Sequence, residues 1–333
     1  MALLLVEYYL INKVFLLFCV IASLLMGGFA LAENVEKKNN NKVAIFYPEA
    51  KEPYHSIYQE IIAGSAKAAS EYDQKISYEK FIITKKFDSQ QIAQTLKNKQ
   101  IYKVIVLGRS GWKLAKELSK LVNENSTKIF QVVSGALPIS PNGVSGVSLI
   151  ADPAYLFGYL NQVAPNVKQI HVAYSEKSAW LIDLAKNAAL KKGLKLNLKY
   201  VTNTAQAIAF YQQIFDSGVS NQDAIWLPLD RISSHDKITL PLILEEAWAK
   251  EVVVFSSKPS HAKRGALFST YPDNFALGQH LFTMVQELEQ QPDQKNFAAL
   301  KSTLLAVNLR TAAHLGLKYS SEQQQQFKLT FPQ

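Results

Sequence analysis

The residues best suited to chemistry in this chain follow short apolar segments. Arginine can bind a carboxylate or a phosphate through two parallel hydrogen bonds, and groups at helix N-termini can donate to the same anions. An aspartate carboxylate can accept hydrogen bonds from a cation. The residues in question are Arg109, Ser110, Ser134, Gly135, Tyr174, Ser178, Asp230 and Ser256. Their types indicate non-covalent recognition of a small polar molecule.

Motifs that usually carry catalysis or bind metals are absent from the sequence. The six histidines show neither His-x3-His nor His-Glu-x-x-His spacing, and no Gly-x-Ser-x-Gly sequence marks a nucleophile. The only cysteine, Cys19, lies in an apolar N-terminal run, so the rest of the chain has no disulfide or thiolate site. We expect no catalytic residue, no metal and no cofactor, although spacing alone leaves a Ser/His/Asp triad open.

Apolar strands alternate with amphipathic helices along most of the chain. The predicted strands cover 43–47, 77–83, 104–107, 129–133, 170–174, 195–201, 224–227 and 252–255, and the predicted helices cover 56–70, 88–97, 112–123, 178–192, 204–215 and 240–249. The pattern restarts after the Pro/Gly/Ser-rich passage 138–146. This alternation predicts an α/β fold with two doubly wound parallel-sheet lobes.

Residues 251–278 indicate how the lobes are joined. We expect a strand, a short polar turn, a second strand beginning at Gly265, and a crossing at Pro272-Asp273. A multi-strand hinge would then connect an N-terminal lobe, 42–147 plus about 272–303, to a C-terminal lobe, 148–271 plus about 304–320. Residues 321–333 are expected to form a weakly ordered tail.

The N-terminus predicts export. Residues 14–32 contain no charged side chain and end in Ala30-Leu31-Ala32, the small-x-small pattern of a signal-peptidase site. We therefore expect a signal peptide at 1–32, a linker at 33–41 and a periplasmic location; the alternative is an uncleaved membrane anchor. The net charge of +9 is spread over many lysines and indicates a solvated basic surface rather than nucleic-acid binding.

Four segments together resemble one family of ABC-transporter substrate-binding proteins, which includes tryptophan and aromatic amino-acid binders. These segments are 143–153, 223–230, 263–267 with Asp273 and Gly278, and 308–316. Pro53-Tyr54 followed by residues 64–69 is similar to the first loop and helix of this family. The sequence departs from the family after Val133, where Ser134 to Pro138 replaces a usual Asp-Pro. The resemblance implies a type I periplasmic-binding fold and an amino acid or related ligand between the lobes.

Ligands of open α/β sheets bind outside the carboxyl ends of the strands. The expected ligand-binding residues are Tyr54, His55, Arg109, Ser110, Ser134, Gly135, Tyr174, Ser178, Asp230, Ser256 and Asp273. The three serines near helix N-termini, Ser110, Ser134 and Ser178, would bind a carboxylate, and Asp230 would bind an ammonium group.

Each of these assignments has a structural alternative. Asp230 and Asp273 can instead cap the helices that follow them, and Arg109 can pair with an acid at the rim. Tyr54 and His55, expected to stack on the ligand, can pack against their own lobe.

The function predicted from these residues is that of a monomeric periplasmic solute-binding protein, which delivers a small ligand to the permease of an ABC importer. The alternative is a sensor of the same fold that reports to a membrane signalling protein. An exported enzyme on this scaffold is a third possibility.

Overall fold

The computed structural model describes residues 42–73, 76–121, 129–290 and 296–332. The expected signal peptide and linker lie outside these residues. Within the described part, no helix combines the length and the apolar character needed to cross a membrane.

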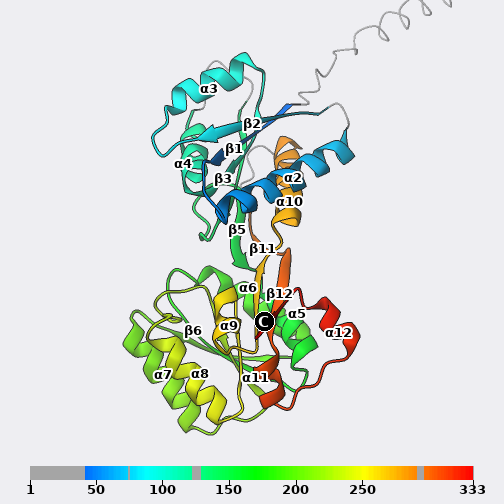
Figure 1. Cartoon of the computed structure of the whole chain (residues 1–333). Helices are drawn as coiled ribbons and strands as arrows, with labels where there is room; N and C mark the ends of the chain where they lie inside the picture. Colours follow the sequence, from blue (N-terminus) through cyan, green and yellow to red (C-terminus); the bar gives the residue numbers. More distant parts are fainter. Residues whose placement is uncertain (1–41, 74–75, 122–128, 291–295, 333) are drawn as a thin grey trace, which may run out of the picture. The chain divides into compact units, whose positions relative to one another are not determined.

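The first sheet has six strands in the order β11-β5-β4-β3-β1-β2, and all of its neighbouring pairs are parallel. Its strands are β1 (Lys42–Pro48), β2 (Ser77–Ile83), β3 (Lys103–Leu107), β4 (Gln131–Leu137), β5 (Gly146–Ala151) and β11 (Phe297–Leu300). Strand β11 comes from a much later part of the chain than the other five strands. The sheet is therefore built from two segments that are distant in the sequence (Figure 1).

Helices cover both faces of the first sheet (Figure 1). One face carries α2 (Tyr54–Tyr72) and α10 (Asn274–Gln290), and the other carries α3 (Ser89–Asn98) and α4 (Gly108–Leu118). Side chains alternate along each strand, so β1 sends Ile45 toward α2 and α10 and Phe46 toward α3 and α4. Burial on both faces explains why these strands are continuously apolar in the sequence.

The helices α2 and α10 cross in close contact because each has a glycine at the crossing. A β-carbon on Gly64 would lie 1.9 Å from the Phe275 carbonyl oxygen, and one on Gly278 would lie 1.9 Å from the Ile61 carbonyl oxygen. Both glycines belong to segments that carry the family resemblance. Their role is therefore to allow the backbones of two helices to approach.

The second sheet has seven strands in the order β13-β12-β10-β9-β8-β6-β7. They are β6 (Gln169–Tyr174), β7 (Lys195–Tyr200), β8 (Asp223–Leu227), β9 (Val253–Ser256), β10 (Phe268–Pro272), β12 (Thr303–Asn308) and β13 (Leu329–Phe331). All neighbouring pairs are parallel except β10 and β12.

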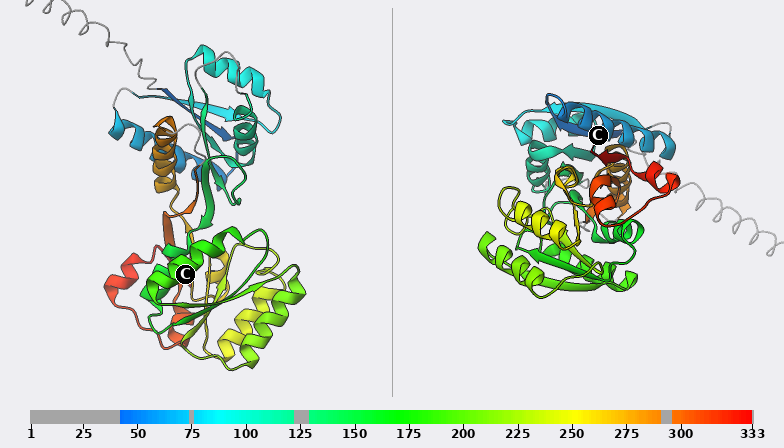
Figure 2. Two further views of the ribbon diagram at one scale, coloured as in Figure 1. Left: turned by 180° about the vertical axis from the view of Figure 1, so that it is seen from behind. Right: turned by 60° about the horizontal axis from the view of Figure 1, so that its bottom comes forward.

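Helices also cover both faces of the second sheet. One face carries α5 (Pro153–Val163) and α6 (Trp180–Lys192), and the other carries α7 (Thr204–Asp216) and α8 (Thr239–Ala249). Figure 2 shows α7 and α8 side by side in both views. Trp226 of β8 packs on the α5 face, where its ring meets Phe157 edge to face at 5.4 Å. The predicted fold class, α/β with two sheets built mainly from parallel strands, is confirmed.

Three connections pass between the two sheets within the described residues. They follow β5, follow β10, and join β11 to β12. Hydrogen bonds link them: the Asp152 N–H donates to the Leu300 carbonyl at 2.9 Å, and the Asp273 N–H donates to the Ser302 carbonyl at 3.0 Å. These connections correspond to the multi-strand hinge expected from the sequence.

The prediction of a short polar turn after Phe255 is wrong. A helix, α9 (Pro259–Arg264), lies between β9 and β10 and begins with a proline in its first turn. The two strands run parallel, so the chain needs a crossover rather than a hairpin turn. The sequence shows two apolar segments that lie close together, and this pattern did not indicate that a crossover is needed between them.

The expectation of a weakly ordered tail is also wrong. Residues 321–332 contain α12 (Ser321–Gln326) and β13, which pairs with β12. A capping box between Ser320 and Gln323 starts the helix, and α11 (Leu309–His314) precedes it. Phe327 and Phe331 are buried. Their packing holds the neighbouring glutamine-rich segment in place, although that segment has few apolar residues of its own.

Candidate functional site

The carboxyl edge of the first sheet presents an open helix N-terminus. Helix α4 begins directly after β3, because Gly108 adopts a φ of 69°, a conformation that favours glycine. The N-cap residue is Leu107, which has no side-chain hydrogen bond to the first turn. Arg109 is exposed and Ser110 is partly buried in this turn. The turn therefore combines backbone donors, a guanidinium group and a hydroxyl group.

One tyrosine of α2, Tyr58, lies near this turn, and a second, Tyr54, lies one helical turn before it. A β-carbon on Gly108 would lie 2.7 Å from the Tyr58 hydroxyl oxygen, so this hydroxyl is close to the turn. Burial raises the pKa of the Tyr58 hydroxyl, and the neighbouring Tyr54 raises it further. Tyr54 is 62% exposed and His55 is also exposed. We call Tyr54, Tyr58, Arg109 and Ser110 the first-sheet edge.

Ser134 and Gly135 lie elsewhere in the fold than expected. Strand β4 extends to Leu137, so both residues lie within the sheet instead of following it. The extension arises because β5 pairs with β4 across a register shift. A β-carbon on Gly135 would lie 2.6 Å from Leu281 Cδ1, and the buried Ser134 hydroxyl has no hydrogen-bond partner among the residues that the structure describes. Packing against α10 accounts for Gly135.

The carboxyl edge of the second sheet is built around Asp230. Its Oδ2 accepts hydrogen bonds from the Ser175 N–H at 2.9 Å, the Ser175 hydroxyl at 2.6 Å and the Ser178 hydroxyl at 2.6 Å. Its Oδ1 accepts from the N–H groups of Ile232 at 2.8 Å and Ser233 at 3.4 Å. The side chain thus connects the loops that follow β6 and β8.

This network keeps Asp230 ionised although it is only 4% exposed. Burial raises the pKa of Asp230, but hydrogen bonds from Ser175, Ser178 and the Ile232 N–H outweigh burial and lower it overall. Five donors fill the acceptor capacity of one carboxylate. The carboxylate caps a turn, not a helix, since α8 begins only at Thr239.

Tyr174 and Ser256 complete this edge. Tyr174 is the last residue of β6, is partly buried, and meets the ring of Tyr200 edge to face at 5.6 Å. Ser256 is the last residue of β9 and is fully buried. We call Tyr174, Ser175, Ser178, Asp230 and Ser256 the second-sheet edge.

Ser256 belongs to a chain of polar contacts that the sequence did not indicate. Its Oγ lies 2.8 Å from His261 Nδ1, and His261 Nε2 lies 2.9 Å from Asp236 Oδ1. The Lys258 ammonium group also donates to Asp236. The order serine, histidine, aspartate matches that of a catalytic triad.

The surroundings of this chain favour a structural role over catalysis. The Ser256 hydroxyl is buried, lies 3.1 Å from the Leu227 carbonyl oxygen, and accepts from the Lys258 N–H at 3.1 Å. Burial lowers the pKa of His261, although Asp236 opposes the effect, so the ring is neutral near pH 7. With Nε2–H donating to the Asp236 carboxylate, Nδ1 accepts from Ser256. The chain therefore ties α9 to the loop after β8.

Asp273 lies at the hinge and caps α10. Its Oδ1 accepts from the Ala276 N–H at 2.9 Å, as an N-cap residue does. The structure thus brings together Tyr174, Ser178 and Asp230, and separately Arg109 and Ser110. Gly135 packs against Leu281, Asp273 caps α10, and Ser134 is buried within β4. Ser175 and Tyr58 also belong to these edges, although neither is among the eleven ligand-binding residues expected from the sequence. The position of Ser175 directly after a predicted strand was the available signal.

Comparison with known proteins identifies what the chain is similar to. The profile of the family described as ABC transporter substrate binding protein matches residues 138–326, more than half of the 333 residues. No curated protein matches the sequence significantly.

Solved structures give a second comparison. The ligand-free, open structure of CD0873, a substrate binding protein with adhesive properties from Clostridium difficile, is 16% identical with a TM-score of 0.55; the match covers 84% of this chain and 96% of that one. An ABC domain in complex with L-Trp from Streptococcus pneumonia is 18% identical with a TM-score of 0.47, over 87% and 99% of the chains. The first similarity shows a shared fold, the type I periplasmic-binding fold.

Proposed function

Because the chain belongs to the ABC transporter substrate-binding protein family, we propose that it is the solute-binding component of an ABC importer. A solute-binding role is the general property of this family. The more specific proposal is that the ligand is an amino acid or a related compound. The two sheet edges would then each supply part of its binding site.

The observation that carries this proposal is the open N-terminus of α4. Its first-turn N–H groups have no side-chain cap, and Arg109 and Ser110 lie in the same turn. Helix N-termini favour anions because of unpaired N–H groups and the helix dipole. A ligand carboxylate bound here would receive backbone donors and a bidentate contact from Arg109. Tyr54 and His55, both exposed, would lie beside the rest of the ligand.

The second-sheet edge would contribute shape more than charge. Asp230 is committed to five internal donors, so an ammonium group could reach it only by displacing Ser175 or Ser178. Direct binding of an ammonium group by Asp230 therefore stays a prediction. We propose that its main role is to hold the loop after β6, and with it Tyr174, in one arrangement.

The partner and the location follow from the same proposal. Members of this family deliver ligand to a membrane transporter, so we propose an ABC permease in the inner membrane as the partner. The protein would be a periplasmic monomer, exported by its N-terminal segment. We further propose that it releases its ligand unchanged, because substrate-binding proteins are generally not enzymes.

Thermal-shift screening of the purified protein tests the proposed function. A ligand that binds only the folded state raises the melting temperature by mass action. We expect a shift with one or more amino acids and none with sugars or nucleosides. Arg109→Gln should abolish the shift, whereas the matched control Arg310→Gln, an exposed arginine of α11, should keep it. Equal shifts in both variants would remove the α4 turn from the binding site.

A further inference from the structure

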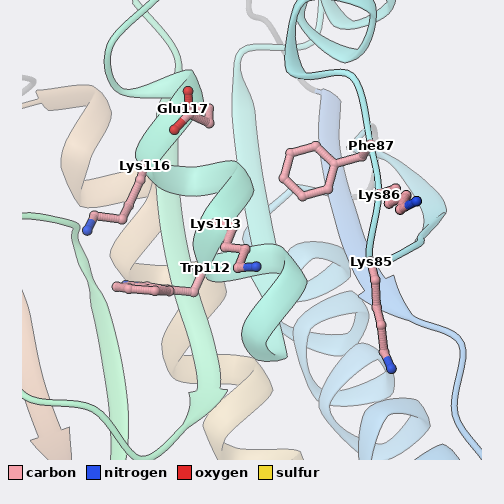
Figure 3. Close-up of a pocket in the computed structure, with 7 residues that line it drawn as sticks. All are labelled: Lys85, Lys86, Phe87, Trp112, Lys113, Lys116 and Glu117. Carbon is pink, nitrogen blue, oxygen red and sulfur yellow. The ribbon is translucent and has the colours of Figure 1, made fainter.

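A second hollow lies on α4, apart from the residues assigned above. It has a volume of about 550 Å³ and is lined by the loop before α3 and by α4, from which Trp112 and Lys116 project on the side away from Phe87 (Figure 3). Its lining residues are Lys85, Lys86, Phe87, Trp112, Lys113, Lys116 and Glu117. None of them belongs to the first-sheet edge. We call this surface the α4 hollow.

The charge of the α4 hollow is strongly positive. Four of its seven lining residues are lysines, and none of these four forms an ion pair with any residue that the structure describes. Its one acid, Glu117, pairs instead with Lys120 at 3.4 Å. Gathering like charges around one concave surface raises the free energy, and an anion bound there would lower it.

The α4 hollow also contains a fixed aromatic ring. The Trp112 indole N–H donates to Asn142 Oδ1 at 3.1 Å, and the Asn142 side chain donates to the Ser140 carbonyl at 2.9 Å. The Lys116 ammonium group lies 4.5 Å from the centre of the Trp112 ring. Figure 3 shows the Phe87 ring directed from the opposite loop toward α4. A planar ligand group would therefore meet an indole whose orientation is already set.

The geometry points to a second binding site, which takes a small molecule that joins a phosphate group to a flat ring. A phosphate monoester carries about two negative charges and accepts several hydrogen bonds, so it can interact with several ammonium groups at once, more than a single carboxylate can. The hollow has the size of a small-molecule site. A nucleoside monophosphate has the required chemistry. Its lining residues differ from those of the proposed amino-acid site, although both sites use α4.

Isothermal titration of the purified protein with adenosine monophosphate tests the proposal. We expect binding that exceeds that of adenosine and of inorganic phosphate, because the ring and the anion are both used. The variant Lys113→Gln/Lys116→Gln should weaken binding by about tenfold or more. The matched control Lys318→Gln/Lys328→Gln changes the net charge equally with two exposed lysines outside the hollow and should bind like the parent.

A second variant separates stacking from charge. Trp112→Leu should lower the affinity for adenosine monophosphate by several-fold while leaving that for inorganic phosphate unchanged. Circular dichroism would establish that each variant is folded. The proposal is overturned if adenosine monophosphate does not bind, or if both lysine double variants weaken it equally. Binding to phosphatidylglycerol vesicles without binding to the nucleotide would also overturn it, since the phosphate would then be that of a lipid headgroup.

Discussion

The carboxyl edges of the two sheets differ in how far their polar groups are already used. At the second-sheet edge, Asp230 receives five internal hydrogen bonds and Ser256 is fully buried. At the first-sheet edge, Arg109 is exposed and the N-terminus of α4 has no cap. At the same position in the topology, the polar groups of the second sheet are used in internal hydrogen bonds, whereas those of the first sheet are exposed or uncapped. Four predictions, ordered by their effect on folding, test this contrast.

The largest loss of stability is expected for Asp230→Ala. The substitution removes the acceptor of two buried serine hydroxyls and three backbone N–H groups, which should lower the free energy of unfolding by about 3 kcal/mol. Denaturant unfolding measures this loss. The control Asp183→Ala removes an exposed acid paired with Lys186 and should change stability by less than about 0.5 kcal/mol. A similarly small loss at Asp230 would show that its network is not a structural element.

A smaller loss is expected for Gly135→Ala, which tests a packed position of the first sheet. The added β-carbon would meet Leu281 Cδ1 at 2.6 Å, so the leucine must shift, at a cost of about 1 to 2 kcal/mol. Gly158→Ala, a substitution in the helix α5, is the control. Its added β-carbon would have no contact closer than 3.5 Å. That change should stabilise the protein by up to about 1 kcal/mol. Equal effects of the two substitutions would contradict the packing role.

The third prediction concerns pH and the contacts of His261. Burial lowers the pKa of His261 below its ordinary value of 6.5, so the unfolded state binds more protons as pH falls below that value. Stability is therefore complete above about pH 6.5 and decreases as the solution becomes more acidic. Asp236, whose pKa is lowered to about 2, adds a further loss below its ordinary value of 3.8.

Unfolding midpoints at about pH 7.5 and about pH 5 measure the histidine contribution. The variant His261→Asn should reduce the difference between the two midpoints, because it removes the buried titrating ring. The control His55→Asn replaces an exposed histidine and should leave the difference unchanged. The same difference in the parent and in His261→Asn would exclude His261 as the source.

The smallest effect on folding is expected for Arg109→Gln. Because the side chain is exposed, the free energy of unfolding should change by less than about 0.5 kcal/mol. The same variant should nevertheless lose the thermal shift with the amino-acid ligand. A large loss of stability would place Arg109 among the structural residues and would remove the contrast between the two edges.

Much of the fold could be predicted because the local signals agree with it. Continuous apolar strands such as 43–47 and 224–227 predicted buried parallel sheets, and the structure contains both as β1 and β8. Helix α9 and strand β13 could not be predicted, because local sequence patterns do not show that β9 pairs in parallel with β10, or that β12 pairs in parallel with β13.

The candidate site was less predictable than the fold. Composition and position placed Arg109, Ser110, Tyr174, Ser178 and Asp230 at strand ends, where the structure has them. Their hydrogen-bond partners were not predictable, since Asp230 meets Ser175 across 55 residues of chain. Whether a polar residue is free or already bonded depends on such contacts.

By itself the sequence determined the alternation of strands and helices, because hydrophobic periodicity and cap residues act within a few positions of the chain. The order of strands in each sheet, the crossing of α2 and α10 at their glycines, and the use of Asp230 were decided only by the tertiary structure. Each of these depends on groups that folding brings together from distant segments, and neither spacing nor composition records that proximity.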